Sequence, residues 1–346
     1  MPHMGQQYSK EADSSKINKN RRCFLGALAG AMSMALTMQA PAMAAAYPDK
    51  PIRLIVPFPA GGSTDTVARI IAKGLQDAMS ASFVVENRAG AGGTVGMAAA
   101  LRSAPDGYTL GVGPVGATII AKLIGMQVPY DPVKDIVPIA NMGSLPLVFA
   151  VKSDLPVKSL GELVALAKSK PGALSYGTSG AGTPGHLAFE YLKKLAGLDI
   201  VHVPYKGDAP LTTDLQGGQL EIGILTGPAA VAQAKSDKLK YLAVTSGVRY
   251  PQLPDVPTVA EAGYKDYNIT IWNVLVAPAG TDPAVIATLN GAMNKVFALE
   301  STKETLKAQG FLPSVFMSPE AAAAFVASER KAWETIVGTT GVTLSN

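Results

Sequence analysis

The sequence is poor in the residues that carry redox and metal chemistry. Its 346 residues include one cysteine, three histidines and two tryptophans, and only 6% are aromatic. The cysteine, Cys23, falls in an apolar N-terminal segment, so we expect the rest of the chain to carry neither a disulfide, a lipid nor a thiolate-bound metal. Nucleic-acid binding needs clustered Lys and Arg, and no such run occurs beyond residue 46. The composition therefore argues against redox, thiolate-metal and nucleic-acid functions.

Most of the net charge lies in an N-terminal leader. The formal net charge is +4, but residues 1–46 hold five basic and two acidic side chains, which leaves 25 basic and 24 acidic ones beyond them. A basic stretch ending at Arg22 precedes an apolar run of about 15 residues, shorter than the roughly 20 that span a membrane. Small residues at Ala44–Ala46 then suit cleavage, so we predict a signal peptide over residues 1–46. The Arg21-Arg22 pair fits the twin-arginine route and general secretion equally.

The remaining chain has the pattern of an α/β protein. It is rich enough in apolar residues to bury a core, with 48% hydrophobic and 16% charged residues overall. Short β-type runs alternate with amphipathic helical stretches, as in parallel sheets covered by helices. The strand Ile52–Val56 opens one βαβαβ unit. A capping box of Ser159 and Glu162 opens the first helix of a second unit.

Two long apolar runs, Leu145–Val151 and Ile269–Ala277, stand apart from this alternation. Each lies between segments that otherwise look self-contained, so we interpret both as crossover strands. Two strands that join two lobes form a hinge with a cleft between the lobes. The predicted lobes are residues 47–146 plus 270–346, and residues 147–269.

Two glycine-rich turns, each between a strand and a helix, are the candidate ligand site. In an open α/β sheet such turns lie at the crevice where ligands bind. Free amides at a helix N-terminus attract an anion, and the absence of a Gly-Lys arrangement argues against nucleotide phosphate. The first turn supplies Phe58, Pro59, Ala60, Gly61, Gly62, Ser63, Thr64 and Asp65, and the second supplies Thr178, Ser179, Gly180, Ala181, Gly182 and Thr183.

A third segment, residues 203–210, follows another strand and is expected at the same rim. Its Asp208 either caps the next helix or contacts the ligand, and capping is the more common role of such a residue. Phe58, Tyr205 and Trp272 could line a cleft that holds a ring, although aromatic side chains more often pack in a core.

A secreted serine hydrolase is the enzyme alternative. Ser179 lies in a glycine-rich turn and could pair with His186 or His202. The nucleophile elbow G-x-S-x-G is broken, however, because Ala181 occupies its last position. Two histidines without a thiolate or an H-E-x-x-H helix do not indicate a metal site, and the G-x-G-x-x-G matches arise readily by chance in a glycine-rich chain. We therefore expect no enzyme activity, no cofactor and no bound metal.

A series of short motifs marks nearly the whole chain beyond the leader. They are residues 47–51 (YPDKP), 56–65 (VPFPAGGSTD), 86–93 (ENRAGAGG), 177–180 (GTSG), 185–187 (GHL), 204–207 (PYKG), 257–264 (PTVAEAGY) and 277–281 (APAGT). In this order they resemble the exported solute-binding proteins of tripartite tricarboxylate transporters, also called Bug proteins.

The resemblance implies a two-lobed periplasmic binding protein of type II, in which each lobe is a doubly wound sheet flanked by helices and two crossover strands join the lobes. It implies that the turns 57–65 and 177–185 grip a ligand carboxylate from opposite sides, partly through ordered water. Asp65 would then orient amides and water rather than touch the anion. Segments that vary in the family are expected to select the far end of the ligand, and here they contain Val115, Gly116, Ala117 and Thr226.

The resemblance also implies a role in transport. We expect a periplasmic monomer that delivers a small organic carboxylate to two integral-membrane permease subunits. The ligand stays open among citrate-like acids, linear dicarboxylates, acidic amino acids and aromatic carboxylates.

Overall fold

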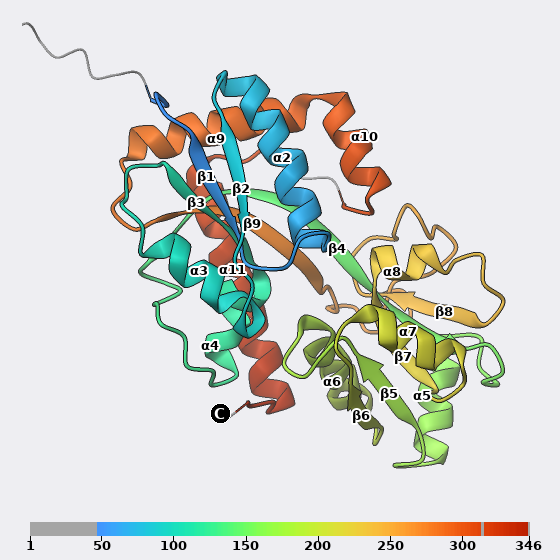
Figure 1. Ribbon diagram of the computed structural model, residues 1–346. Coiled ribbons are helices and arrows are strands. Elements are labelled where there is room, and N and C mark those ends of the chain that lie inside the picture. Colours follow the sequence, from blue (N-terminus) through green and yellow to red (C-terminus); the bar gives the residue numbers. More distant parts are fainter. Residues whose placement is uncertain (1–46, 313–314, 345–346) are drawn as a thin grey trace, which may run out of the picture. The chain divides into compact units, whose positions relative to one another are not determined.

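The computed structural model describes residues 47–312 and 315–344. The predicted signal peptide and its cleavage site lie outside these residues. The described residues form one continuous α/β unit built on two half-sheets (Figure 1). None of the described helices is long and apolar enough to cross a membrane.

A mixed sheet of nine strands runs through the described part of the chain (Figure 1). The strands are β1 (Ile52–Val56), β2 (Phe83–Asn87), β3 (Thr109–Pro114), β4 (Ile136–Lys152), β5 (Ser175–Thr178), β6 (Val201–Pro204), β7 (Ile222–Thr226), β8 (Leu239–Val244) and β9 (Thr270–Pro278). Their order is β2-β1-β3-β9-β4-β7-β5-β6, and β8 also pairs with β4. β1 is parallel to β2 and β3, and β5 is parallel to β6 and β7, whereas β9 and β4 run antiparallel to their neighbours.

The long strand β4 belongs to two half-sheets. Residues 136–146 pair with β9 and complete the first half-sheet, which contains β2, β1 and β3. Residues 147–152 lie between β7 and β8 in the second half-sheet, which also contains β5 and β6. The sequence pointed only to the second part of this strand. Its first part contains Pro138 and Gly143, which disfavour regular strands, and two register shifts accommodate them.

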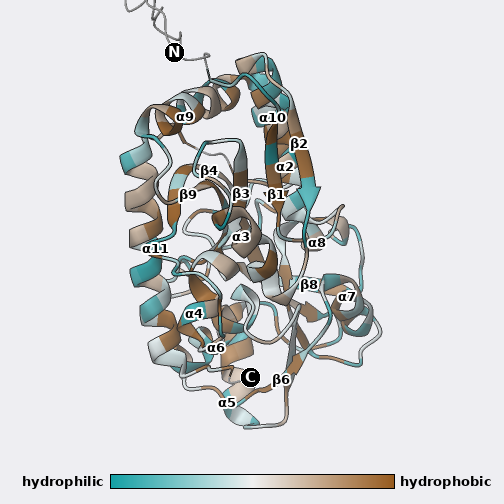
Figure 2. Ribbon diagram, turned by 60° about the vertical axis from the view of Figure 1, so that its left-hand side comes forward, coloured by the Kyte–Doolittle hydropathy of each residue, from teal (hydrophilic) through white to brown (hydrophobic). Residues whose placement is uncertain are grey.

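Helices cover both faces of the first half-sheet, so the side chains of β9 are buried on both of its sides. Val274 and Val276 pack in one core with Met97, whereas the intervening Leu275 and Ala277 pack in another core with residues of the first long helix. This alternation is the two-residue period of a strand buried on both sides. In Figure 2 hydrophobic residues predominate on β1, β3 and β9, while the end of β2 is hydrophilic.

The described helices of eight or more residues are α2 (Ser63–Met79), α3 (Thr94–Leu101), α5 (Leu160–Ser169), α6 (Pro184–Ala196), α7 (Asp208–Gln216), α9 (Pro283–Ala298), α10 (Glu300–Ala308) and α11 (Pro319–Thr340). The shorter ones are η1 (Ala91–Gly93), the π-helical turn η2 (Gly116–Ile120), α4 (Ala121–Leu123) and α8 (Gly227–Ala232). Ser159 accepts a hydrogen bond from the backbone amide of Glu162, so the predicted N-cap of α5 is confirmed. Asp282 and Ser318 cap α9 and α11 in the same way.

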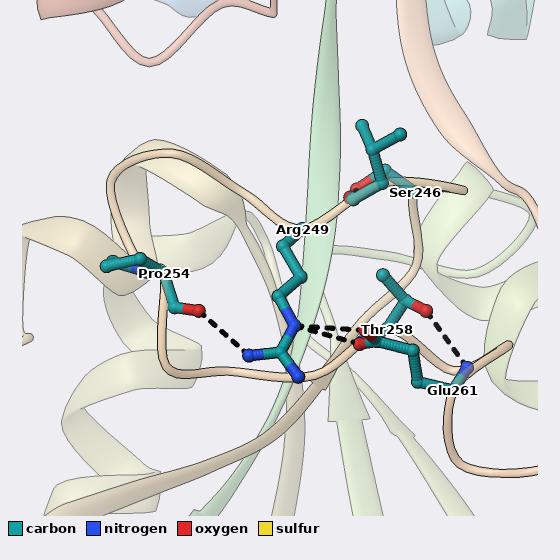
Figure 3. Close-up of polar contacts among 6 residues, drawn as sticks. Ser246, Arg249, Pro254, Thr258 and Glu261 are labelled. Carbon is teal, nitrogen blue, oxygen red and sulfur yellow. Dashed lines mark hydrogen bonds and ion pairs between the residues drawn. The ribbon is translucent and has the colours of Figure 1, made fainter.

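A proline-rich surface segment follows β8 and is held by Arg249 (Figure 3). Arg249 Nε donates to both carboxylate oxygens of Glu261 at 3.1 Å, and its Nη1 donates to the Pro254 carbonyl at 3.2 Å. Glu261 and Thr258 also exchange side chain to backbone bonds, of 2.7 and 3.0 Å. The motif 257–264 therefore builds a turn and does not line the cavity described below.

Thr245 joins the two segments that link the half-sheets. Its buried hydroxyl accepts from Leu147 N at 2.9 Å and donates to Ile269 O at 2.6 Å. The backbone of Thr245 adds a bond to Leu147 O at 2.9 Å and one from Ile269 N at 2.8 Å. One residue thus ties β4, where it enters the second half-sheet, to the segment that leads into β9.

The substitution Thr245→Val tests this role because it keeps the shape of the side chain and removes its hydroxyl. It leaves the buried Leu147 N–H and Ile269 C=O without this partner, so we expect the free energy of unfolding to fall by about 1–3 kcal/mol. Thr245→Ser keeps the hydroxyl, so its free energy of unfolding should fall by less. Urea denaturation of both variants provides the measurement, and equal stability of the two would contradict the assigned role.

Candidate functional site

A cavity of about 620 Å³ brings the two glycine-rich turns together. One wall comes from the β1–α2 turn and the other from the β5–α6 turn. The predicted site residues that line it are Phe58, Pro59, Ala60, Gly62, Ser63, Thr64, Val115, Gly116, Ser179, Ala181, Gly182 and Thr183. The lining also includes residues that were not among the predicted site residues, namely Ala91, Gly92, Pro114, Ala121, Ile124, Met126, Pro184, Ile271 and Leu344.

Other predicted site residues do not line this cavity. They are Gly61, Asp65, Ala117, Thr178, Gly180, Asp208 and Thr226. Ala117 is buried beneath the wall, where its carbonyl accepts from the Tyr130 hydroxyl at 2.7 Å. Of the three aromatic candidates, Phe58 lines the cavity, whereas Tyr205 bonds Asp214 and the buried Trp272 donates to Glu329.

The first turn presents the open end of helix α2 to the cavity. Gly62 is the N-cap residue, and no side chain caps the helix there. The N–H groups of the first helical turn, including those of Ser63 and Thr64, have no partner within the helix. They carry the partial positive charge of the helix N-terminus, which suits an anion. Gly61 has a φ of +86°, a conformation that glycine adopts without strain.

Asp65 holds this turn in place from behind. Its carboxylate is 3% exposed and accepts from Gly61 N at 2.9 Å, from Arg69 Nε at 2.9 Å and from Asn87 Nδ2 at 2.8 Å. Asn87 Nδ2 also donates to Phe58 O at 2.9 Å, so both ends of the turn are fastened. Burial alone would raise the pKa of Asp65, but these hydrogen bonds and the charge of Arg69 lower it. Asp65 is thus a charged positioning residue.

Asp65→Ala should loosen the first turn while α2 persists. We expect hydrogen exchange of the Gly61 amide to accelerate by at least about tenfold, because opening this bond loses roughly 1.4 kcal/mol or more of protection. Asp77→Ala, at an exposed position of the same helix, is the matched control and should leave Gly61 protected.

The lowered pKa of Asp65 also makes its contribution pH-dependent. The stability that ionised Asp65 contributes is fully present above the ordinary pKa of an aspartate, and it is lost as the pH falls through the lowered pKa of the folded protein.

The second turn is built from hydroxyl-to-backbone bonds. Thr178 Oγ1 and Thr183 Oγ1 both donate to Gly180 O, at 3.0 and 2.7 Å. Thr183 is also the N-cap of α6, accepting from His186 N at 3.4 Å. Gly180 and Gly182 have φ values of +150° and +71°, so glycine is required at both positions. These bonds hold the turn together, and its residues Ser179 and Thr183 line the cavity.

Two stacked histidines support the second turn. The rings of His186 and His202 lie 4.0 Å apart at 12°. His186 Nδ1 accepts from Gly182 N at 3.1 Å, and His202 Nε2 lies 2.8 Å from Thr178 Oγ1. Burial lowers the pKa of both rings. Repulsion by the charge of His186 lowers the pKa of His202 further, and together these effects bring it to about 4. Nearby Glu190 opposes these shifts and Lys193 adds to them.

This arrangement predicts a stability that falls on mild acidification. The unfolded chain takes up protons below pH 6.5, whereas the folded protein keeps His202 neutral until about pH 4. The chain therefore takes up protons when it unfolds in this range, and the free energy of unfolding should drop as the pH falls from 6.5 toward 4. Denaturation at pH 7, 6 and 5 measures the drop. His202→Phe keeps a stacked ring and should flatten the profile; an unchanged slope would contradict the assignment.

The same bonds bear on the hydrolase alternative. The described hydrogen bonds of the His186 and His202 rings go to Gly182 and Thr178 and not to Ser179. The geometry thus gives no support to a nucleophile activated by either ring. Within residues 47–312 and 315–344, no group of three or more His, Cys, Asp or Glu side chains could hold a metal ion.

Asp208 does not cap α7, and its contact with a ligand stays a prediction. The N-cap of α7 is Gly207, with a φ of +107°, so the expectation that Asp208 caps this helix is wrong. Its Oδ2 instead accepts from Thr226 Oγ1 at 2.6 Å, and its buried Oδ1 has no partner in the described chain. Burial raises the pKa of Asp208, which opposes the effect of the Thr226 bonds.

Comparison with known proteins decides the family. A model of the tripartite tricarboxylate transporter family receptor matches residues 67–342. The chain belongs to this receptor family. The resemblance read from the motifs is therefore confirmed.

Its relatives in the receptor family align over most of their length. Protein BugT of Bordetella pertussis is 39% identical over 306 residues, which cover 88% of this chain and 94% of BugT. The R. palustris protein Rpa4515, solved with adipate, has a TM-score of 0.77 and 34% identity, covering 86% of this chain and 99% of its own. MatC from Rhodopseudomonas palustris, solved with bound malate, has a TM-score of 0.72 and 30% identity, covering 84% and 100%. The predicted two-lobed α/β fold is confirmed, and the lobe boundaries stay a prediction.

Proposed function

We propose that this protein is an exported receptor that captures a small organic carboxylate between the turns 57–65 and 177–185 and hands it to a membrane permease. One observation carries the proposal: the open N-terminus of α2 and Ser179 of the second turn lie at the same cavity. Relatives solved with adipate and malate support the ligand class.

The lining suits a carboxylate that is bound without a countercharge. None of the described side chains that line the cavity is acidic or basic. Hydroxyls of Ser63, Thr64 and Ser179 and the amides at the helix end are the available donors, since the Thr183 hydroxyl donates to Gly180 O. Such donors bind an anion directly or through ordered water, which bridges nearly as well as a direct bond.

We expect ligand binding to close the two lobes about β4 and β9. A carboxylate gripped by both turns makes its full set of contacts only when the turns are close, so it favours the closed form. Closure would present a distinct shape to the permease, for which we propose two integral-membrane subunits. We further propose that the receptor acts as a periplasmic monomer.

The variant Gly62→Val tests the placement of the site. Gly62 has a φ of −77°, and a Cβ there would contact only Pro59 O, at 3.7 Å, so the backbone accepts a side chain. The valine side chain would fill the space next to the α2 amides, so we expect carboxylate binding to fall by at least about 100-fold, or roughly 2.7 kcal/mol. The melting temperature of the ligand-free protein should change little.

The measurement is a thermal-shift screen of wild type and variant against a carboxylate library, since a ligand that binds only the folded state raises the melting temperature. Ser179→Ala should weaken binding more mildly, by about 0.5–1.5 kcal/mol. Gly338→Val, at an exposed position of α11 with open space around it, is the matched control. Unchanged binding by Gly62→Val would show that the carboxylate lies elsewhere.

A further inference from the structure

The C-terminal tail takes part in the cavity. Helix α11 ends at Thr340, and Gly341, with a φ of +68°, turns the chain away from the helix axis. Leu344 N then donates to Ile124 O at 2.7 Å. The half-buried side chain of Leu344 lines the cavity, although it lies far in the sequence from both glycine-rich turns.

Leu344 packs directly on the second turn. A Cβ added to Gly182 would overlap Cδ1 of Leu344 and lie 2.8 Å from Cδ1 of Ile124. The two side chains therefore cover the backbone of the second turn at Gly182. This close approach is a second reason, besides its positive φ, why position 182 requires glycine.

Leu344 belongs to an apolar wall of the cavity. Ile124, Met126, Val115 and Ile271 also line the cavity and offer only hydrocarbon and thioether surface. A ligand hydroxyl or ammonium group against this wall would lose its water without gaining a partner. A methylene group placed there gains roughly fourfold in affinity from the removal of its surface from water.

We propose that Leu344 determines specificity, and that the ligand is a carboxylate whose body is hydrocarbon rather than hydroxylated. The donors of the two turns hold the carboxylate, and the tail closes an apolar compartment around the body. This inference rests on the proposed function, because it assigns the rest of the same ligand.

Substitutions of Leu344 leave every described helix and strand intact in sequence, since this residue follows the end of α11. Isothermal titration calorimetry should compare hexanoate, octanoate, adipate, malate and citrate as probes. The variants are Leu344→Ala and Leu344→Asn, with Leu195→Ala as the matched control at a position of α6 that is 46% exposed.

For the wild type we expect the tightest binding from a probe with a hydrocarbon body. Leu344→Ala should weaken that probe about fivefold to tenfold and shift the preferred chain length upward by one or two methylenes, because it lengthens the compartment. Leu344→Asn should reduce the difference in affinity between adipate and malate. Leu195→Ala should match the wild type.

The outcomes separate this inference from the proposed function. Tightest binding of malate or citrate by the wild type would overturn the assignment of a hydrocarbon body and leave the receptor function standing. Leu344→Ala and Leu344→Asn affinities within twofold of Leu195→Ala for every probe would overturn the role of the tail. If no carboxylate binds, both proposals fail.

Discussion

The shared strand β4 is the constraint on which the rest of the structure depends. Its first eleven residues pair with β9 in one half-sheet, and its remainder lies between β7 and β8 in the other. Each glycine-rich turn stands at the carboxyl end of a parallel strand, and each strand is linked to β4 by pairing: β1 through β3 and β9, and β5 through β7. Thr245 joins β4 to the segment preceding β9 through four hydrogen bonds. A continuous hydrogen-bonded frame therefore connects the two turns.

Binding and positioning are divided between different groups at the site. The donors that face the cavity are neutral amides and hydroxyls, whereas the ionisable groups lie behind the turns. Asp65 fastens the first turn, and the neutral His186 ring accepts from the second. Such preorganised donors lose little freedom when an anion arrives. An ionised side chain inside the cavity would instead have to be desolvated with every ligand.

Local signals were sufficient for much of the fold. The strand Ile52–Val56 has the expected bounds, and the serine and aspartate caps ahead of α5, α9 and α11 depend on neighbours in the sequence. The first part of β4 was missed because its Pro138 and Gly143 disfavour a strand, and only pairing with β9 and two register shifts make it one. The prediction that Asp208 caps α7 was wrong, because the residues around a helix start do not reveal a partner farther along the chain, such as Thr226.

The sequence by itself determined the alternating α/β pattern, the two glycine-rich turns and the family, because each is encoded in short contiguous stretches. Only the tertiary structure decided which of those residues face the cavity and which support it. Gly62 and Asp65 are three residues apart, yet one lines the wall and the other is buried behind it. Leu344 entered the site with no local signal at all. Its position depends on the end of α11 and on a backbone bond to Ile124, which are contacts between segments that only folding brings together.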